Sequence, residues 1–429
     1  MSKLTSSKLL TLSPFWCVFI FIYCFSLSLF SQQKNNPAAQ LGLLDLSNWD
    51  IETDGMIPLN GSWKFYWNEL YNPADYAADD SSSIEYFTLP KLWNNHIVKG
   101  EKISSNGYAT FQLTVTGNFN GKNLALTLPD MYSSYNLWID GKLIAHNGVP
   151  GTDKESTIPQ WIPYTKTFNV QRDTISILLN ISNFHHKKGG IKDAIWLGTA
   201  DQLLAERQTN VSANLIQIVG LLLLFALSMF AYFHYKRNKI FIFFSLFSLT
   251  WAIRGLFTNM YLMNFWFPEF SWTLGTKTEY LTLYITLLLG VQIVGKMYAE
   301  HANKLARYIS HLVNGIFILI TLFAPTKLFS QLLNTYFIFA GLFMAYIVIV
   351  IMNALINDKR GAGYLSLSIL VVIFLFFYDL FSFQQLIPRN PYIISFGYLI
   401  IYYINGLGIW YRLSHVETTV LSSDYTYQE

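Results

Sequence analysis

Three ionisable residues stand inside long apolar stretches of this 429-residue chain: Arg254, Glu279 and Asp379. A charge at the centre of a bilayer costs about 2.5–3.5 kcal/mol on insertion scales, so such residues usually pair with one another or mark a transport or signalling path. We therefore predict that these three side chains form an intramembrane polar network that transmits a signal. The alternatives are a static ion pair, or side chains that reach the membrane interfaces.

A polar loop over residues 145–164 contains the candidate ligand-binding residues. Ligands commonly bind on loops that a rigid scaffold carries. Aromatic rings beside amides and carboxylates suit sugars and similar polar molecules, which favours a ligand site here. The alternative is a capping loop whose aromatic residues pack on the domain beneath. The candidates are Asn147, Asp153, Glu155, Trp161 and Tyr164.

Other reactive residue types give no sign of catalysis. Cys17 and Cys24 both lie in the first hydrophobic stretch, so the folded regions have no thiolate nucleophile and no disulfide. The pair His185–His186 matches no metal-ligand spacing, and we interpret it as part of a solvated loop. No basic run suggests nucleic-acid binding. We predict a protein that is not an enzyme, with no catalytic residue, no metal and no cofactor.

Seven apolar stretches are long enough to place these residues in a membrane. Charged residues make up 13% of the chain, against about 25% in soluble domains. Several stretches have about 20 mostly apolar residues, which span a hydrocarbon core of ~30 Å as helices. We predict a seven-helix transmembrane domain over residues 209–413. The predicted spans are Val211–Tyr235, Ile240–Phe257, Ser271–Val294, Tyr308–Phe323, Gln331–Leu355, Gly363–Phe383 and Pro391–Leu413.

The region ahead of these spans has the pattern of an all-β domain. Apolar and polar residues alternate over 111–115 and 175–181, which is typical of strands with one buried face. Asp140-Gly141 separates two short apolar runs and favours a type I′ hairpin. We predict one β-sandwich over residues 36–205. The polar stretch 202–215 contains neither proline nor glycine, so it could extend the first span as a helix.

The flanking segments and loop charges predict an orientation. Residues 1–31, with two lysines ahead of an apolar core, are a signal peptide or signal anchor, and residues 414–429 are a short cytoplasmic tail. Positive residues favour the cytoplasmic side, which places the β domain outside and the C-terminus inside the cell. The positive residues of the odd-numbered loops and the C-terminal end are Lys236, Arg237, Lys239, Lys296, Lys304, Arg307, Lys359, Arg360 and Arg412.

Several motifs resemble bacterial seven-transmembrane receptors with diverse intracellular signalling modules. The first two spans, with Leu249–Leu256, and the segments Thr278–Thr282 and Tyr378–Leu380 are similar to that family. The β domain resembles the galactose-binding-like, jelly-roll sandwich that precedes such spans and many glycosidases. Its carrying segments are Leu59–Trp67, Leu89–Trp93, Gly107–Phe111 and Leu137–Gly141. The resemblance implies an extracytoplasmic sensor coupled to an intracellular output domain, for which the sixteen residues after Leu413 leave no room.

The sequence thus favours a multi-pass receptor of the bacterial inner membrane. Its sandwich would sense a small polar ligand such as a carbohydrate. Its seven helices, surrounded by membrane lipid, would relay the signal to a cytoplasmic signalling protein supplied as a separate chain. One alternative is a transporter, or an enzyme or accessory protein of envelope polysaccharide synthesis, that uses the sandwich for substrate capture. A purely structural scaffold is another.

Overall fold

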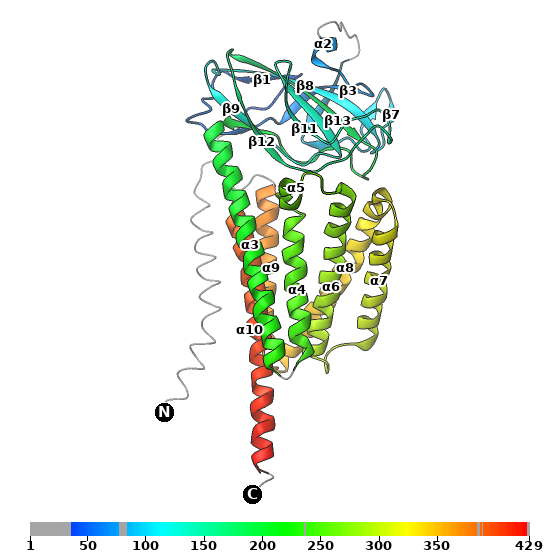
Figure 1. Cartoon of the computed structure of the whole chain (residues 1–429), viewed down its shortest axis with the longest axis vertical. Coiled ribbons are helices and arrows are strands. Elements are labelled where there is room, and N and C mark those ends of the chain that lie inside the picture. The colour runs from blue at the N-terminus through cyan, green and yellow to red at the C-terminus, as the bar shows by residue number, and fades with distance from the viewer. Residues whose placement is uncertain (1–35, 77–83, 236, 384–386, 388, 427–429) are drawn as a thin grey trace.

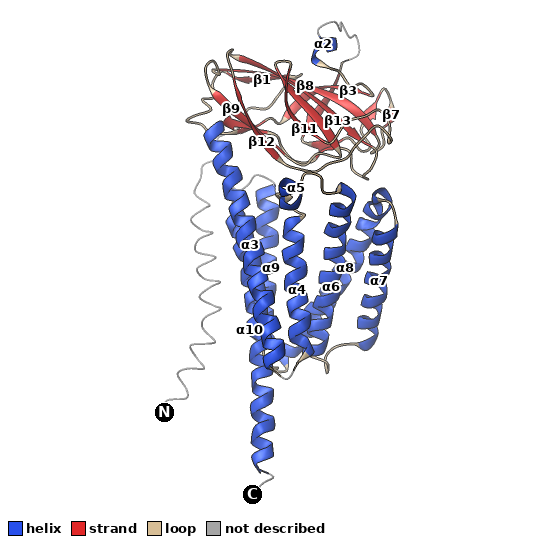
Figure 2. Cartoon of the chain, in the orientation of Figure 1, coloured by secondary structure: helices blue, strands red, loops and turns tan. Residues whose placement is uncertain are grey.

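The computed structural model describes residues 36–426 except 77–83, 236, 384–386 and 388. The predicted signal segment and Lys236 lie outside the described residues. Strands gather at one end of the molecule and long helices at the other, as Figure 1 and Figure 2 show. The predicted order, a β domain followed by a seven-helix membrane domain, is confirmed.

The β domain contains fifteen strands among the described residues, with one short helix, α2 (Pro73–Tyr76). The strands are β1 (Leu43–Leu46), β2 (Ile57–Pro58), β3 (Gly61–Trp67), β4 (Glu85–Leu89), β5 (Lys91–Leu92), β6 (Ile97–Val98), β7 (Glu101–Lys102), β8 (Gly107–Gly117), β9 (Asn123–Leu128), β10 (Ser134–Ile139), β11 (Lys142–Asn147), β12 (Tyr164–Asn169), β13 (Thr174–Asn183), β14 (Gly190–Ile191) and β15 (Trp196–Thr199).

Two main sheets enclose the core of this domain. A seven-stranded sheet runs in the order β11-β10-β13-β8-β3-β4, with β1 parallel to β8, and a four-stranded sheet runs β12-β9-β15-β2. The longest pairing joins β13 to β8, from Thr174 opposite Thr116 to Asn183 opposite Gly107. Asp140 and Gly141 connect β10 to β11 with φ of 48° and 82°, which is the backbone that the predicted type I′ turn requires.

Eight helices follow the sandwich: α3 (Ala200–His234), α4 (Lys239–Leu256), α5 (Leu262–Trp266), α6 (Trp272–Met297), α7 (Lys304–Phe323), α8 (Thr326–Ile356), α9 (Ala362–Phe383) and α10 (Pro391–Thr426). All but the short α5 are long and apolar enough to cross a membrane. The chain is therefore a multi-pass membrane protein. The sequence did not predict α5, which lies between the second and third spans.

The first membrane helix starts directly on the sandwich. Thr199, the last residue of β15, caps α3: its side chain accepts the N–H of Gln202, and the Gln202 side chain accepts the N–H of Thr199. This reciprocal pair satisfies two backbone donors at the helix start. The predicted helical extension through residues 202–215 is confirmed, because α3 continues from there to His234 without a break.

The long helices form a ring. Neighbours pack in the order α3, α4, α6, α8, α9, α10 and back to α3, while α7 packs outside the ring on α6 and α8. The predicted fourth span starts four residues too late in the chain. Helix α7 begins earlier, because Asn303 caps it by accepting the N–H groups of Leu305 and Ala306. Helix α10 continues past residue 413 through most of the predicted tail, and it extends beyond the other helices at the end opposite the sandwich (Figure 1).

Candidate functional site

The sandwich meets the adjacent ends of the helices through a buried aromatic cluster. Tyr132 and Trp161 come from the sandwich, and Tyr261 and Trp272 from the membrane domain. The Trp161 ring lies 5.2 Å from that of Trp272, nearly perpendicular to it, and 6.0 Å from that of Tyr261. Edge-to-face pairs of this kind are worth about 0.5–1.5 kcal/mol beyond their buried area. Trp272 is the first residue of α6, so Trp161 contacts a helix end directly.

A charged pair lies beside the aromatic cluster. Lys192 Nζ lies 3.3 Å from Asp130 Oδ2, and the Tyr261 hydroxyl donates to the same carboxylate oxygen at 3.4 Å. Lys192 also lies over the Tyr132 ring at 5.7 Å. Burial alone would lower the pKa of the Lys192 ammonium, but nearby Asp130, Tyr132 and Asp193 outweigh that effect and raise it. Lys192 therefore stays charged, and the membrane domain supplies one hydrogen bond to a sandwich ion pair.

His186 is buried against this cluster, so the interpretation of His185–His186 as a solvated loop was wrong for His186. Its ring stacks on Tyr132 at 4.7 Å and is 2% exposed. Asn183 fixes the turn, because its amide donates to the carbonyls of His186 and Lys188 and its oxygen accepts the N–H of His186. Burial, and after it the charge of Lys188, lowers the pKa of His186 to about 3. The ring is therefore neutral at physiological pH.

Four further hydrogen bonds fasten the two domains together. Lys187 reaches α8, where its Nζ donates to Asn334 at 3.0 Å and its N–H to Ser330 at 3.3 Å. In the opposite direction, Lys327 Nζ donates to Asn106 of the sandwich at 3.0 Å. Gln160 donates to the Pro268 carbonyl at 3.0 Å. The sandwich is thus tied to α8 and to the segment before α6, in addition to its covalent link to α3.

We define the contact face as Asp130, Tyr132, Trp161, His186 and Lys192 of the sandwich with Tyr261 and Trp272 of the helices. The predicted intramembrane residues lie partly beneath it. Arg254 on α4 donates to the Glu279 carbonyl on α6 at 2.6 Å and lies over the Trp251 ring at 5.7 Å. The Glu279 carboxylate is within electrostatic range of both Arg254 and Lys192. Two of the three predicted network residues therefore lie together.

Asp379 lies apart from the other two intramembrane residues. Its side chain is on the exposed surface of α9, and no hydrogen bond or ion pair joins it to Arg254 or Glu279 among the described contacts. Tyr398 of α10 is within electrostatic range of both Asp379 and Arg254. A connection of Asp379 to Arg254 and Glu279, which would run through Tyr398, stays a prediction.

The five candidate ligand residues occupy different environments. Asp153 and Glu155 are exposed at the tip of the loop, where Asp153 accepts the N–H and hydroxyl of Ser156. Trp161 is buried in the contact face. Asn147 is buried and donates to the Ile162 carbonyl at 3.0 Å, and Tyr164 is half-buried at the start of β12. The loop thus presents carboxylates outward and one indole ring to the membrane domain.

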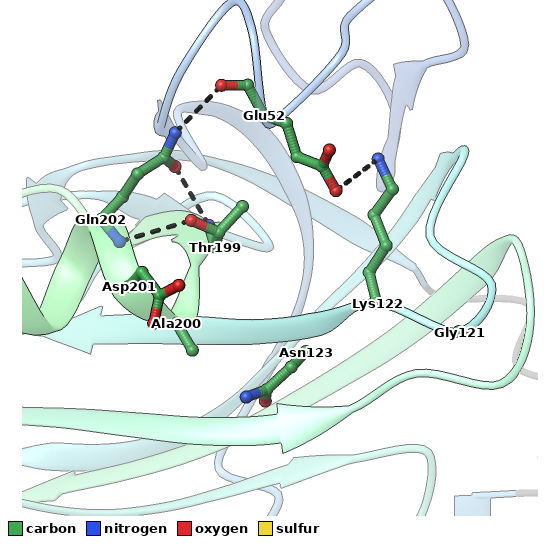
Figure 3. A pocket seen from close by; sticks show the side chains of 8 residues that line it. All are labelled: Glu52, Gly121, Lys122, Asn123, Thr199, Ala200, Asp201 and Gln202. Carbon is green, nitrogen blue, oxygen red and sulfur yellow. Dashed lines mark hydrogen bonds and ion pairs between the residues drawn. The ribbon is translucent and has the colours of Figure 1, made fainter.

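A polar pocket of about 400 Å³, which the sequence did not predict, lies where α3 leaves the sandwich (Figure 3). Lys122 spans it to pair with Glu52 at 3.4 Å. Gln202 of α3 donates to the Ile51 and Glu52 carbonyls at 3.1 and 3.4 Å. Its lining residues are Glu52, Gly121, Lys122, Asn123, Thr199, Ala200, Asp201 and Gln202. Both acidic and basic groups therefore face a space at the start of the first membrane helix.

Comparison with known proteins bears on both halves of the chain. Residues 214–411 match the family model described as 7TM diverse intracellular signalling. The range begins in α3 and ends in α10, so it covers the whole ring of helices. No curated protein gives a match.

Part of the chain is similar to solved structures of β-galacturonidase, β-glucuronidase and β-galactosidase, at low identity and low TM-score. A GH2 β-galacturonidase from Eisenbergiella tayi is 12% identical over 33% of this chain and 24% of its own, with a TM-score of 0.25. A β-glucuronidase from Faecalibacterium prausnitzii is 12% identical over 39% and 32%, with a TM-score of 0.27. A putative β-galactosidase from Bacteroides fragilis is 15% identical over 33% and 22%, with a TM-score of 0.25. The chain thus spans about a quarter to a third of their length.

Proposed function

We propose that this receptor-like membrane protein, whose seven-helix domain is of the 7TM diverse intracellular signalling family, senses a small polar ligand outside the cell. The helices then pass the signal to a cytoplasmic signalling protein on another chain. The observation that carries this proposal is the contact face, where a sandwich ion pair and a sandwich indole ring are buried against helix ends. Any shift of the sandwich must move α6 or break these contacts, so ligand and helices can favour the same conformational state.

The loop over residues 148–162 is the proposed sensing element. Its carboxylates Asp153 and Glu155 face solvent, where they can accept hydrogen bonds from a carbohydrate-like ligand. Its far end carries Gln160 and Trp161, which contact the membrane domain. One short loop therefore joins a solvent-exposed polar surface to the start of α6. The pocket at the root of α3 is the competing ligand position for the same function.

A cytoplasmic protein would engage the end of the bundle opposite the sandwich. That end has a rim of positive residues, and Glu300 pairs there with Lys359 at 3.3 Å and with Arg412 at 3.7 Å. The positive-inside rule supports a cytoplasmic position for this end. The ring of helices would transmit movement of the contact face to a partner bound on α10. The described rim residues are Arg237, Lys239, Lys296, Lys304, Arg307, Lys359, Arg360 and Arg412.

Ligand binding is tested with the purified full chain and a panel of neutral and acidic monosaccharides. A binding sugar should raise the midpoint of thermal unfolding in a concentration-dependent way. Glu155→Gln should abolish that shift if the loop binds the sugar, whereas Asp201→Asn should abolish it if the pocket does. Lys142→Gln, at an exposed strand start, is the matched control. If no sugar of the panel raises the midpoint of thermal unfolding of the unmodified chain or of any variant, a carbohydrate-like ligand is contradicted.

Signal output is tested in the native host with a cysteine at Ser414, in a background without Cys17 and Cys24. Crosslinking should trap one discrete signalling protein, and the binding sugar should change its yield. Trp161→Leu should keep sugar binding but remove this change, because it breaks the contact with Trp272. Recovery of no partner, with or without sugar, would contradict a receptor with a separate output protein.

The orientation is tested independently with single cysteines on intact cells. Thr152 and Asn357 are both exposed, on the sandwich and after α8 respectively. An impermeant thiol reagent should label Thr152→Cys and leave Asn357→Cys unlabelled until the cells are broken. Equal labelling of both positions on intact cells would overturn the proposed placement of the sandwich outside.

A further inference from the structure

The ring of helices borders an apolar cavity of about 350 Å³ that is partly open. Side chains from α4, α6, α8, α9 and α10 line it, and these helices are consecutive members of the closed ring, so the space is inside the bundle. Protein interiors are normally packed as densely as organic crystals, with few voids larger than a water molecule. This volume is within the range of small-molecule sites, about 300–1,000 Å³.

The cavity wall is hydrocarbon except at a few places. Phe247, Leu287, Met344 and Ile401 are typical lining residues. The residues that line it include no Asp, Glu, Lys or Arg. Apolar cavities of this kind stay dry and take up apolar molecules. A charged group would lose its hydration here without gaining a counter-ion, so the wall selects against ions.

One hydroxyl group in the wall lacks a partner. Tyr402 is 3% exposed, and its hydroxyl makes no hydrogen bond among the described residues. Its ring is held by stacking on Phe247 at 4.8 Å. A buried hydroxyl that is left unpaired is costly, and native structures nearly always satisfy such groups. The hydroxyl lies just behind the wall, and a small turn of the Tyr402 ring would bring it to the cavity, where an oxygen atom from a bound molecule would accept its proton and remove that cost.

We propose that this cavity binds an uncharged lipophilic molecule with one oxygen acceptor, of the class of medium-chain alcohols and esters. Its hydrocarbon part fills the space between α4, α6 and α8, and its oxygen accepts a hydrogen bond from Tyr402. At about 30 Å³ for each water-sized group, the space takes roughly a dozen non-hydrogen atoms. The molecule enters from the membrane, where such compounds concentrate.

The position of the cavity connects it to the contact face. Trp251 lines the cavity, and the Arg254 guanidinium lies over its ring at 5.7 Å. Arg254 in turn bonds the Glu279 carbonyl below the contact face. A molecule against Trp251 therefore fixes the ring on which Arg254 rests. The cavity is a second ligand site, separate from any site on the sandwich.

The test uses the full chain in lipid nanodiscs with a photoreactive twelve-carbon alcohol as the probe. Labelled peptides are mapped by mass spectrometry while unlabelled dodecanol competes. We expect saturable labelling of peptides that contain cavity residues of α4, α8 or α10. Labelling that dodecanol cannot displace, or that falls only on the outer faces of the helices, would overturn the proposal.

Two variants locate the bound probe. Gly290 lines the cavity, and a side chain there would point at Ile347 and Phe247, so Gly290→Leu fills the space and should reduce saturable labelling at least tenfold. The control is Gly315→Leu on α7, where the added side chain meets open space and labelling should not change. Equal loss in both variants, or in neither, would contradict the cavity as the site.

A third variant and a charged competitor test the chemistry. Tyr402→Phe keeps the ring and removes only the hydroxyl, so the apparent affinity for dodecanol should fall about fivefold to tenfold, as for one lost hydrogen bond. The midpoint of thermal unfolding without probe should be equal or higher, because Phe removes the unpaired hydroxyl, and this separates the loss of affinity from misfolding. Dodecanoate at pH 8 should compete at least tenfold less well than dodecanol. Unchanged affinity in Tyr402→Phe, or equal competition by dodecanoate, would refute the assigned ligand class.

Discussion

One continuous apolar cluster fills the β-sandwich, whereas the helix bundle has two clusters with a cavity that residues of both line. In the sandwich, Phe65 and Phe111 are fully buried with ring centres 5.0 Å apart. In the bundle, the larger cluster joins α3, α4, α9 and α10 with parts of α6 and α8, and the smaller cluster joins α6, α7 and α8. The sandwich is thus built to hold one shape. The bundle core is divided into two clusters that share α6 and α8 and border one cavity.

The largest expected effect compares the loss of stability from a substitution in the filled core of the sandwich with that from one in the cavity wall of the bundle. Phe111→Ala should lower the free energy of unfolding of the sandwich by about 3–5 kcal/mol, because the surrounding core cannot close the space. Phe247→Ala in the cavity wall should cost the bundle less than half as much, since the ring already borders empty space. Scanning calorimetry of the full chain in nanodiscs measures both. Equal losses would mean that the bundle is packed as tightly as the sandwich.

An ion pair with a buried carboxylate should matter more than one with an exposed carboxylate. Lys192→Met leaves Asp130 without its cation in the contact face and should cost about 2–3 kcal/mol of unfolding free energy. Lys122→Met, which removes pairs with the exposed carboxylates of Asp50 and Glu52, should cost less than about 1 kcal/mol. The double variant Lys192→Met with Asp130→Leu should recover most of the loss. If it does not, the interpretation of Lys192 as the partner of Asp130 fails.

His186 makes the contact face sensitive to acid. Its folded-state pKa of about 3 lies below the value near 6.5 of an unfolded histidine, so the unfolded chain binds the extra proton as the pH falls. The stability that neutral His186 contributes is complete above pH 6.5 and is lost progressively toward pH 3, by about 2 kcal/mol at pH 5. His186→Phe keeps the ring and should flatten this part of the stability–pH curve. If the stability–pH curves of the unmodified protein and of His186→Phe run parallel, the acid sensitivity does not come from His186.

The smallest expected effect compares two helix glycines. A Cβ at Gly220 would stand 2.5 Å from Leu399 Cδ2, so Gly220→Ala should loosen the α3–α10 contact and cost about 1 kcal/mol or more. At Gly290 the nearest atoms are 3.7 Å away, so Gly290→Ala should be neutral or stabilise α6 by up to about 1 kcal/mol. The midpoints of thermal unfolding in nanodiscs show which of the two variants is less stable. The reverse order would mean that α3 and α10 can separate more easily than the cavity wall can accept a methyl group.

Patterns local to the chain predicted the elements well. Alternation over 175–181 identified β13, whose Ile175, Ile177, Leu179 and Ile181 are buried, and long apolar runs identified the seven spans. The helix through 202–215 could be predicted because no glycine or proline interrupts it. These features depend on neighbours within a few residues, which a sequence shows directly.

The contact face could not be predicted in this way. Asp130 and Lys192 lie on separate loops that the sandwich fold brings together, and Tyr261 joins them from another domain. Trp161 was interpreted as a ligand aromatic because its neighbours are polar, but its partner Trp272 is far along the chain. Arg254 does bond residue 279, but it bonds the main-chain carbonyl, so the predicted network of three charged side chains stays a prediction.

Because helix α3 is unbroken, a tilt at its sandwich end displaces its far end. Its 35 residues run from the Thr199 cap to the far side of the bundle, about 52 Å at 1.5 Å per residue. A tilt of about 5° at the sandwich end would displace the far end by about 4–5 Å, close to the rise of one helical turn. The capping box and the two hydrogen bonds from Gln202 to the 51–52 segment fix the angle at which α3 leaves the sandwich. A small rotation of the sandwich thus becomes a displacement at the far end of the bundle that is comparable to one helical turn.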